Sequence, residues 1–209
     1  MATYCTSTQV AEVLQISNFN AGSTPKDEVI DRYIERAEAK IESITAHAWQ
    51  TKTISNEYLE PSSLYRYGTG IRFKLTHRSI KTFSTGSGDK LEVWDGNSWV
   101  DYVSAKTEGR GNDFWVNYEE GVVYLIGINN IYPDGVRCTY RYGESTVSAS
   151  IEECACLMAA IMVLNSPEFV SATFTDDGGS SRRNDDPRIS EWKETINNIL
   201  ANNTEFNVF

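Results

Sequence analysis

The spacing of hydrophobic residues changes twice along this 209-residue chain, and these changes constrain the fold more than any other feature. Hydrophobic residues recur every three or four positions up to about residue 50, every second position over residues 51–142, and every three or four positions again afterwards. The first spacing places side chains on one face of an α-helix, and the second on one face of a β-strand. An α+β protein is therefore predicted, with helices before and after a block of strands.

Two helices are expected before the strands. A short amphipathic helix covers Thr6–Leu14, with hydroxyl residues able to cap its start. A long helix then runs to about Trp49, with Thr24 as its expected cap and Pro25 as its first residue. Its hydrophobic stripe consists of Val29, Ile30, Tyr33, Ile34, Ala37, Ile41, Ile44 and Ala48.

Several short antiparallel strands are expected in the middle of the chain, because aromatic and β-branched residues alternate there with turn formers. The candidate strands are Thr51–Leu59, Ile71–Leu75, Lys90–Trp94, Trp99–Val103, Phe114–Tyr118, Val122–Ile126 and Val136–Tyr142. A loop over residues 95–98 would set Trp94 opposite Trp99, and a second hairpin would turn at residues 119–121. The alternation favours Trp94, Trp99 and Trp115 as core residues.

Helical spacing returns at Ser148, a predicted cap, and continues to Leu164. This helix is apolar over most of its circumference, so it must be buried against the long helix or against neighbouring molecules. A polar run over residues 173–186 is predicted to be a flexible loop, and Pro187 is expected to start a last helix. The chain ends in an apolar tail.

These segments predict a bundle of about four helices with a large antiparallel β insertion, as a small sheet, a sandwich or a barrel. Residues 1–50 and 143–200 would form the helical core, residues 51–142 the inserted β domain, and residues 201–209 an extended C-terminal docking arm.

The net charge of -10 and the pI near 4.7 argue against a protein that wraps nucleic acid or lies on anionic lipid. No stretch of about 18 uncharged apolar residues is present. A soluble protein made in the cytoplasm is therefore expected, with no membrane partner. The four cysteines lack the spacing of a disulfide scaffold, which favours reduced, packed thiols.

Residues for chemistry are sparse. His47 and His77 stand outside any metal-binding pattern, and Gly86–Lys90 lacks the spacing of a phosphate-binding loop. The acid pairs fall in expected turns and loops, where carboxylates are usually solvated. They are Glu119–Glu120, Asp176–Asp177 and Asp185–Asp186. We therefore expect no catalytic, cofactor or metal site, and no enzyme.

The aromatic residues of the β segment leave one alternative open. Exposed aromatic rings stack on sugars, so Trp94 or Trp99 could serve a carbohydrate-binding or adhesin module of a virion or cell surface.

Four segments together resemble a known family. They are a Thr-x-x-Gln-Val-Ala-x-Val-Leu helix at Thr6–Leu14, the long charged helix Asp27–Trp49, a strand ending at Tyr140–Gly143, and the helix start Val147–Ala160. This arrangement resembles the head–tail connector, or head-completion adaptor, family of long-tailed double-stranded DNA viruses. The resemblance covers about half of the chain, in the helices, and the β segment is much larger than the short hairpin of compact members.

The resemblance implies a structural virion protein. It would form a dodecameric ring between the capsid portal and the tail or neck-completion protein, retain packaged DNA, and be assembled in the host cytoplasm. DNA would pass through the ring without sequence-specific binding. Subunits of such a ring meet through two different patches.

Residue roles follow as expectations. The tail residues Glu205, Phe206, Val208 and Phe209 would dock on the portal, or the tail would fold back on its own subunit. Candidates for contacts between subunits are Ile151, Leu157, Met158, Ile189, Trp192 and Ile196. Candidates on the tail side are Arg110, Asn112 and Asp113, in a loop expected to be mobile until assembly or to contact the tail.

Overall fold

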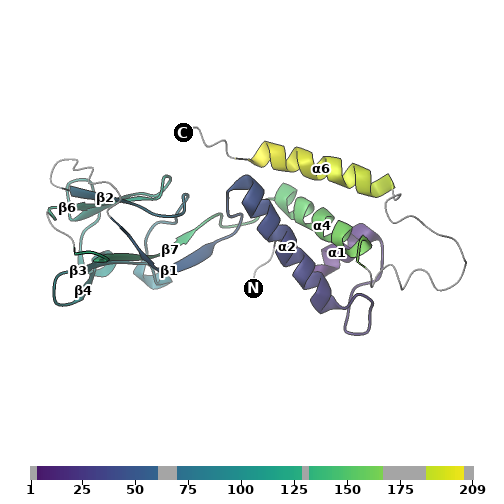
Figure 1. The fold of residues 1–209 in the computed structure, drawn as a ribbon, viewed down its shortest axis with the longest axis horizontal. Helices are drawn as coiled ribbons and strands as arrows, with labels where there is room; N and C mark the ends of the chain where they lie inside the picture. The colour runs from purple at the N-terminus through teal and green to yellow at the C-terminus, as the bar shows by residue number, and fades with distance from the viewer. Residues whose placement is uncertain (1–3, 61–69, 129–131, 167–186, 205–209) are drawn as a thin grey trace, which may run out of the picture. The chain divides into compact units, whose positions relative to one another are not determined.

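The computed structural model describes residues 4–60, 70–128, 132–166 and 187–204. The chain divides into two compact units: residues 1–50 with 146–209, called here the helical unit, and residues 51–145, the β unit (Figure 1). The predicted α+β class, with a bundle of about four helices and antiparallel strands, is confirmed.

The helical unit is built around one central helix. Its main elements are α1 (Ser7–Leu14), α2 (Asp27–Thr45), α4 (Ala149–Leu164) and α6 (Pro187–Asn203). α4 packs against each of the other three. Most of its residues are buried: Ile151, Cys154, Ala155, Cys156, Leu157, Met158, Ala159, Ala160 and Val163. The prediction that this apolar helix must be buried is confirmed, and helices of the same chain provide most of the cover.

The start of α1 follows the sequence prediction. Thr6 Oγ1 accepts a hydrogen bond from the Gln9 amide, and Gln9 Oε1 accepts one from the Thr6 amide at 2.8 Å. This reciprocal capping box satisfies two amides that have no partner inside the helix.

The boundaries predicted for the long helix are wrong at both ends. α2 begins at Asp27, with Lys26 at the cap position and no side-chain cap, while the Thr24–Pro25 peptide is cis and precedes the helix. At the other end Ala46 adopts a left-handed conformation with φ of 53°. The helix ends at Thr45, so Trp49 lies beyond it. The indole of Trp49 donates a hydrogen bond back to Thr45 Oγ1.

The β unit contains two antiparallel sheets. One has the strand order β1 (Lys52–Tyr58), β7 (Val136–Tyr142), β3 (Lys90–Trp94), β4 (Trp99–Asp101). The other has the order β2 (Gly70–Lys74), β6 (Val122–Ile126), β5 (Phe114–Asn117). Both are open, so the described strands form no closed barrel. Their buried side chains belong to one core: Leu59, Ile71, Phe73, Leu75, Ile80, Leu91, Val93, Phe114, Val116, Val123, Leu125, Val136, Cys138 and Tyr140.

The first predicted hairpin forms with a shorter second strand. Trp94 pairs with Trp99 as predicted. The Asp95 carboxylate accepts hydrogen bonds from the amides of Asn97 and Ser98 and holds the turn. The strand expected to reach Val103 ends at Asp101, because the Asp101 side chain accepts from the Val103 amide and caps the short helix α3 (Tyr102–Ala105). A single-turn 3-10 helix, η1 (Thr85–Ser87), precedes β3.

The prediction that the tryptophans fill the core is wrong. Trp94, Trp99 and Trp115 are only half-buried, whereas the residues that alternate with them along β3 and β5 are buried. The tryptophan rings instead pack against other aromatic rings outside the core. The ring centroids of Trp94 and Trp99 are 5.6 Å apart, and those of Trp115 and Tyr124 are 4.6 Å apart. The alternation of residues along the sequence therefore distinguished the two faces of each strand, but it did not show which face is buried.

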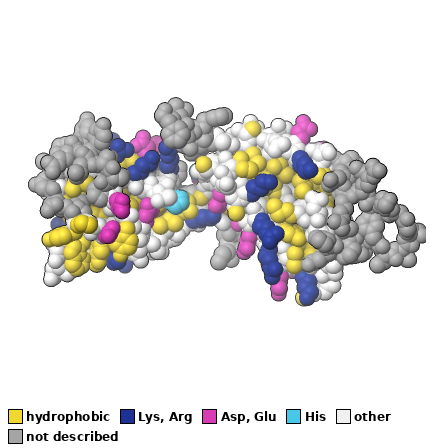
Figure 2. All heavy atoms as spheres, viewed as in Figure 1, with side chains coloured by type: hydrophobic (Ala, Val, Ile, Leu, Met, Phe, Trp, Pro, Cys, Tyr) yellow, Lys and Arg dark blue, Asp and Glu magenta, His cyan; other side chains and the backbone are white. Residues whose placement is uncertain are grey.

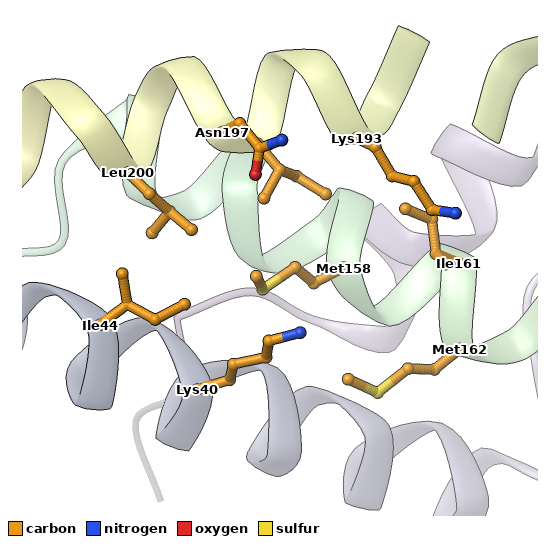
Figure 3. Close-up of a pocket in the computed structure, with 9 residues that line it drawn as sticks. Lys40, Ile44, Met158, Ile161, Met162, Lys193, Asn197 and Leu200 are labelled. Carbon is orange, nitrogen blue, oxygen red and sulfur yellow. The ribbon is translucent and has the colours of Figure 1, made fainter. Parts of the chain in front are cut away.

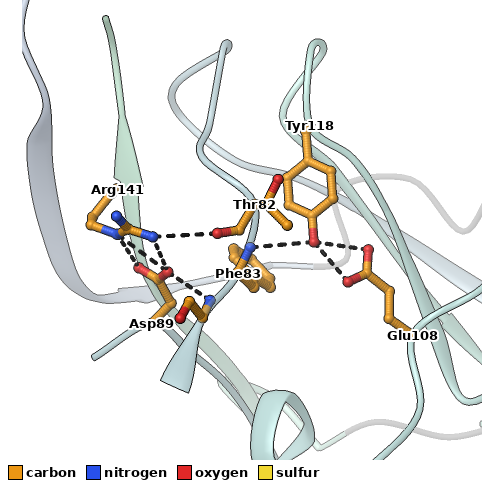
Figure 4. Close-up of polar contacts among 7 residues, drawn as sticks. Thr82, Phe83, Asp89, Glu108, Tyr118 and Arg141 are labelled. Carbon is orange, nitrogen blue, oxygen red and sulfur yellow. Dashed lines mark hydrogen bonds and ion pairs between the residues drawn. The ribbon is translucent and has the colours of Figure 1, made fainter. Parts of the chain in front are cut away.

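A buried ion pair fastens the segment before β3 to β7 (Figure 4). The Asp89 side chain is 1% exposed and accepts from Arg141 Nη2 at 2.8 Å and from the Ser84 amide at 2.9 Å. Arg141 also donates to the carbonyl oxygen of Thr82. Nearby, the Tyr118 hydroxyl donates to Glu108 and accepts from the Phe83 amide.

Removing the Arg141 charge should destabilise the β unit strongly. We expect Arg141→Met to lower the free energy of unfolding by about 3 kcal/mol, because it leaves the Asp89 carboxylate buried without its counter-ion. Urea unfolding followed by tryptophan fluorescence measures the change. Lys81→Met is the control, with an expected loss below about 0.5 kcal/mol, because the Lys81 ammonium group donates to the exposed hydroxyl of Ser145 and the substitution leaves the backbone bond of Lys81 in place. Equal losses in the two variants would contradict the assignment.

Candidate interaction site

The residues first considered for chemistry have structural roles in the described parts of the chain. His77 Nδ1 lies 2.9 Å from the Tyr140 hydroxyl, and its ring stacks on Tyr142 with centroids 3.8 Å apart. His47 packs edge-on against Trp49. No group of ligating side chains among the described residues could hold a metal ion. No described helix is long and apolar enough to cross a membrane.

The helical unit carries an open apolar groove of about 370 Å³ between α2, α4 and α6 (Figure 3). Its lining residues are Lys40, Ile44, Met158, Ile161, Met162, Lys193, Ile196, Asn197 and Leu200. Ile44 is 42% exposed, although the sequence placed it on the hydrophobic stripe of the long helix. Hydrophobic side chains flanked by Lys and Arg are visible on the surface of this unit in Figure 2.

Two lysines give the groove a positive rim. Lys40 extends from α2 and Lys193 from α6, and both are exposed (Figure 3). Within the described residues, neither ammonium group has an ion-pair partner. The methionines of α4 add flexible, polarisable side chains that adapt to a partner surface. The groove is therefore suited to an occupant that is apolar and carries negative charge.

The other edge of α2 is acidic. Glu28, Asp31 and Glu35 are exposed there, and Asp31 lies nine residues before Lys40, half a turn away around the helix. The pKa of Asp31 is raised by partial burial and by the neighbouring carboxylates of Asp27, Glu35 and Glu28. The three exposed carboxylates themselves concentrate negative charge at this edge.

α1 lies on the acidic side of the unit. Just before it, the Tyr4 hydroxyl donates to Glu42, and the Tyr4 amide donates to Glu38. α1 packs against α4, whereas the groove residues Met158 and Met162 lie on the opposite face of α4 from Cys156, which contacts the segment at the start of α1. The groove and the acidic edge are therefore on opposite sides of the helical unit.

Three of the four buried thiols belong to the helical unit. The pKa of the Cys5 thiol is raised by its hydrogen bond with Cys156, by burial, and by the carboxylates of Glu38 and Glu152. Burial and Glu153 raise the pKa of Cys154 to about 11, and burial also raises that of Cys138 in the β unit. All four cysteines are buried, and none of them forms a disulfide.

The residues predicted to form contacts between subunits differ in how much of each side chain is exposed. Ile151 is fully buried, and Leu157 and Ile189 are nearly so. Met158 and Ile196 are also mostly buried but line the groove, while Trp192 is half-buried beneath the guanidinium of Arg188. Their role between subunits stays a prediction. The predicted portal-docking residues Glu205, Phe206, Val208 and Phe209 lie outside the described residues, as does the loop at 173–186.

The predicted tail-side loop is held within the β unit. The Asp113 carboxylate accepts from the Thr107 amide, the Asn112 amide donates to the Gly109 carbonyl, and the Arg110 guanidinium lies 4.3 Å from the centre of the Trp115 ring. Arg110 and Asn112 are exposed. These contacts do not support the expectation of a mobile loop.

A second surface of interest is aromatic. On the outer face of the first sheet, Tyr58 is 52% exposed and packs edge-on against Trp99. The guanidinium of Arg137 lies 4.3 Å from the centre of the Trp99 ring and forms two hydrogen bonds with Glu92. Arg137 therefore occupies one face of Trp99.

Sequence reasoning missed Lys40, Lys193 and the exposure of Ile44. Spacing marked Ile44 as a stripe residue, but the groove arises only where α2 and α6 meet over α4, and these helices are far apart in sequence. A lysine within an otherwise apolar stretch of surface was the only available signal, and surface lysines are too common to identify a site.

The comparisons with known proteins concern the fold. The chain matches no protein-family model and no curated protein sequence. Among solved structures, it is similar to a chain in the neck of an empty gene transfer agent (GTA) particle computed with C6 symmetry. The TM-score is 0.52 at 13% sequence identity, over 97% of this chain and 90% of that chain. This similarity shows a shared fold along nearly the whole length.

The thiols should react slowly in the folded protein. At pH 8 we expect alkylation of Cys5, Cys138 and Cys154 about a hundredfold slower than in the urea-unfolded chain, because burial shields these thiols and their raised pKa values suppress the reactive thiolate. Mass spectrometry after timed alkylation measures each cysteine separately. The stability that the raised pKa values confer is fully present below about pH 8.5 and is lost as pH rises toward the folded pKa. Fast alkylation of any one thiol before unfolding would contradict its burial.

Proposed function

We propose that this chain is a structural head–tail adaptor: a ring between the portal of a capsid and the tail, which retains packaged DNA and provides the platform for tail attachment. The observation that carries the proposal is the fold shared along 97% of the chain with a protein in the neck of a GTA particle. The two unlike surfaces on opposite sides of the helical unit support it, because a ring needs two different patches on each subunit.

The charge of the chain supports a position around DNA. With a net charge of -10, the protein repels the phosphate backbone and lets DNA pass without being held. A dodecamer agrees with the C6 symmetry imposed on the similar neck, since a ring of twelve contains a six-fold axis.

The proposed contact with the portal is the C-terminal arm. The residues involved are Glu205, Phe206, Val208 and Phe209. Apolar side chains that alternate with polar ones can add a strand to a receptor sheet or fill pockets on it. We further propose that the loop with Arg110, Asn112 and Asp113 meets the tail or neck-completion protein.

A carbohydrate-binding module is the second candidate, and the outward position of the tryptophans is the observation that favours it. The adaptor remains preferred, because Arg137 occupies one face of Trp99 and Trp94 meets it at an interplanar angle of 62°. Sugar stacking requires an open ring face, which leaves Tyr58 as the most exposed ring of the patch.

Replacing the apolar residues of the arm should abolish docking. We expect particles that carry Phe206→Ser with Phe209→Ser to lose DNA from filled heads and to fail to bind tails, because the apolar anchors are gone. Electron microscopy and nuclease protection of packaged DNA provide the readouts. Asn207→Ser is the matched control, since it changes a polar residue of the same arm and should have no effect. Filled heads that keep their DNA and tails in the double variant would rule out docking through this arm.

The adaptor and carbohydrate-binding functions predict opposite results for glycan binding by the purified chain. On a glycan array we expect no saturable binding by the wild type, because Arg137 covers one face of Trp99 and Trp94 packs edge-on against the same ring. Binding to one class of glycan that disappears in Tyr58→Ala, but persists in the control Tyr132→Ala, would instead favour the carbohydrate-binding function. Tyr132 is a suitable control because it is similarly exposed, at 55%.

A further inference from the structure

We infer that the groove between α2, α4 and α6 receives the acidic side of the helical unit of a second copy of this chain. The acidic side is defined by the exposed residues Glu28, Asp31 and Glu35 of α2, by Glu12 of α1, and by Ile16, which follows the C-terminal end of α1. The inference rests on the proposed function, which needs a contact between copies, and assigns that contact to named surfaces.

Charge complementarity identifies the occupant. The rim lysines Lys40 and Lys193 have no ion-pair partner within the described residues. Glu28, Asp31 and Glu35 lie exposed at successive turns of one helix edge, where like charges three and four residues apart repel each other. Each set supplies the charge that the other lacks, so contact relieves the repulsion at the acidic edge.

Apolar surface is exposed on both sides. The groove offers Ile44 at 42% exposure and also Met162 farther along its lining, while Ile16, directly after α1, is 38% exposed. Burying these side chains together removes apolar area from water, worth about 25 cal/mol per Å². The charges at the rim then set orientation and association rate more than affinity.

The geometry excludes pairing within one molecule. The groove and the acidic edge lie on opposite sides of one packed bundle, so Lys40 cannot reach Asp31 of its own helix. A contact between two different patches repeats from one subunit to the next, and it closes into a ring when the rotation per step divides a full turn. The same pair of surfaces on each copy is thus sufficient for a ring.

Charge reversal tests this assignment with the full-length chain. One variant carries Lys40→Glu with Lys193→Glu, and the other carries Asp31→Lys with Glu35→Lys. Sedimentation velocity measures self-association. Low salt keeps the charge attraction unscreened, and chain concentrations up to about 1 mM allow the weak association expected of a small interface to be detected. Wild type should self-associate, and each variant alone should bind itself at least about tenfold more weakly, because its two patches then carry like charge.

Mixing the two variants provides the decisive measurement. In the mixture, each reversed groove meets a reversed acidic edge and each native groove meets a native one, so association should return to the wild-type level. This recovery cannot occur if either variant has simply failed to fold. The control carries Lys74→Glu with Lys90→Glu, two exposed lysines of the β unit, and should associate like wild type.

Three results would overturn the inference: a wild-type chain that stays monomeric throughout, single variants that associate normally, or a mixture that does not recover. The proposed function fails separately. If the pure chain behaves as described but particles carrying either variant still assemble complete necks, the surfaces pair in solution without serving the adaptor. If the pure variants associate like wild type but particles carrying them lack complete necks, the adaptor proposal stands, and the contact between copies lies on other surfaces.

Discussion

The burial of α4 is the constraint on which the helical unit depends. A helix that is apolar over most of its circumference needs neighbours on several sides, and α1, α2 and α6 supply them. Three helices cannot cover a fourth completely, and the strip left open between α2 and α6 becomes the groove. The same sequence property that makes the core therefore also makes the one apolar surface for which we propose a partner.

Local chemistry made much of the fold predictable. The strand and hairpin predictions hold closely because turn formers such as Asp95 and Gly121 bind or bend the backbone locally; Gly121 has φ of 66°. The capping box at Thr6 is likewise complete within four residues. The failures lie at the ends of α2: Thr24 looked like a cap, but the helix starts later, and beyond its other end the Trp49 amide donates to the Tyr4 hydroxyl, a partner far away in sequence.

The candidate site was much less predictable than the fold. The alternation along β3 and β5 separated Trp94 and Trp115 from Val93 and Val116, but only the packing of two sheets decides which set is buried. The groove combines Lys40 with Lys193, which are distant in sequence and meet only when both helices pack on α4. Sequence spacing describes one element at a time, so a surface shared by three elements escapes it.

The position of the two lysines gives the acidic composition a physical meaning. A chain with a net charge of -10 repels its own copies at long range, and this repulsion opposes uncontrolled association. Lys40 and Lys193 place positive charge beside the exposed apolar surface of the groove, so attraction is strongest where the apolar contact also forms. In the proposed contact, specificity between copies would arise from where positive charge lies beside the apolar groove, not from the total charge.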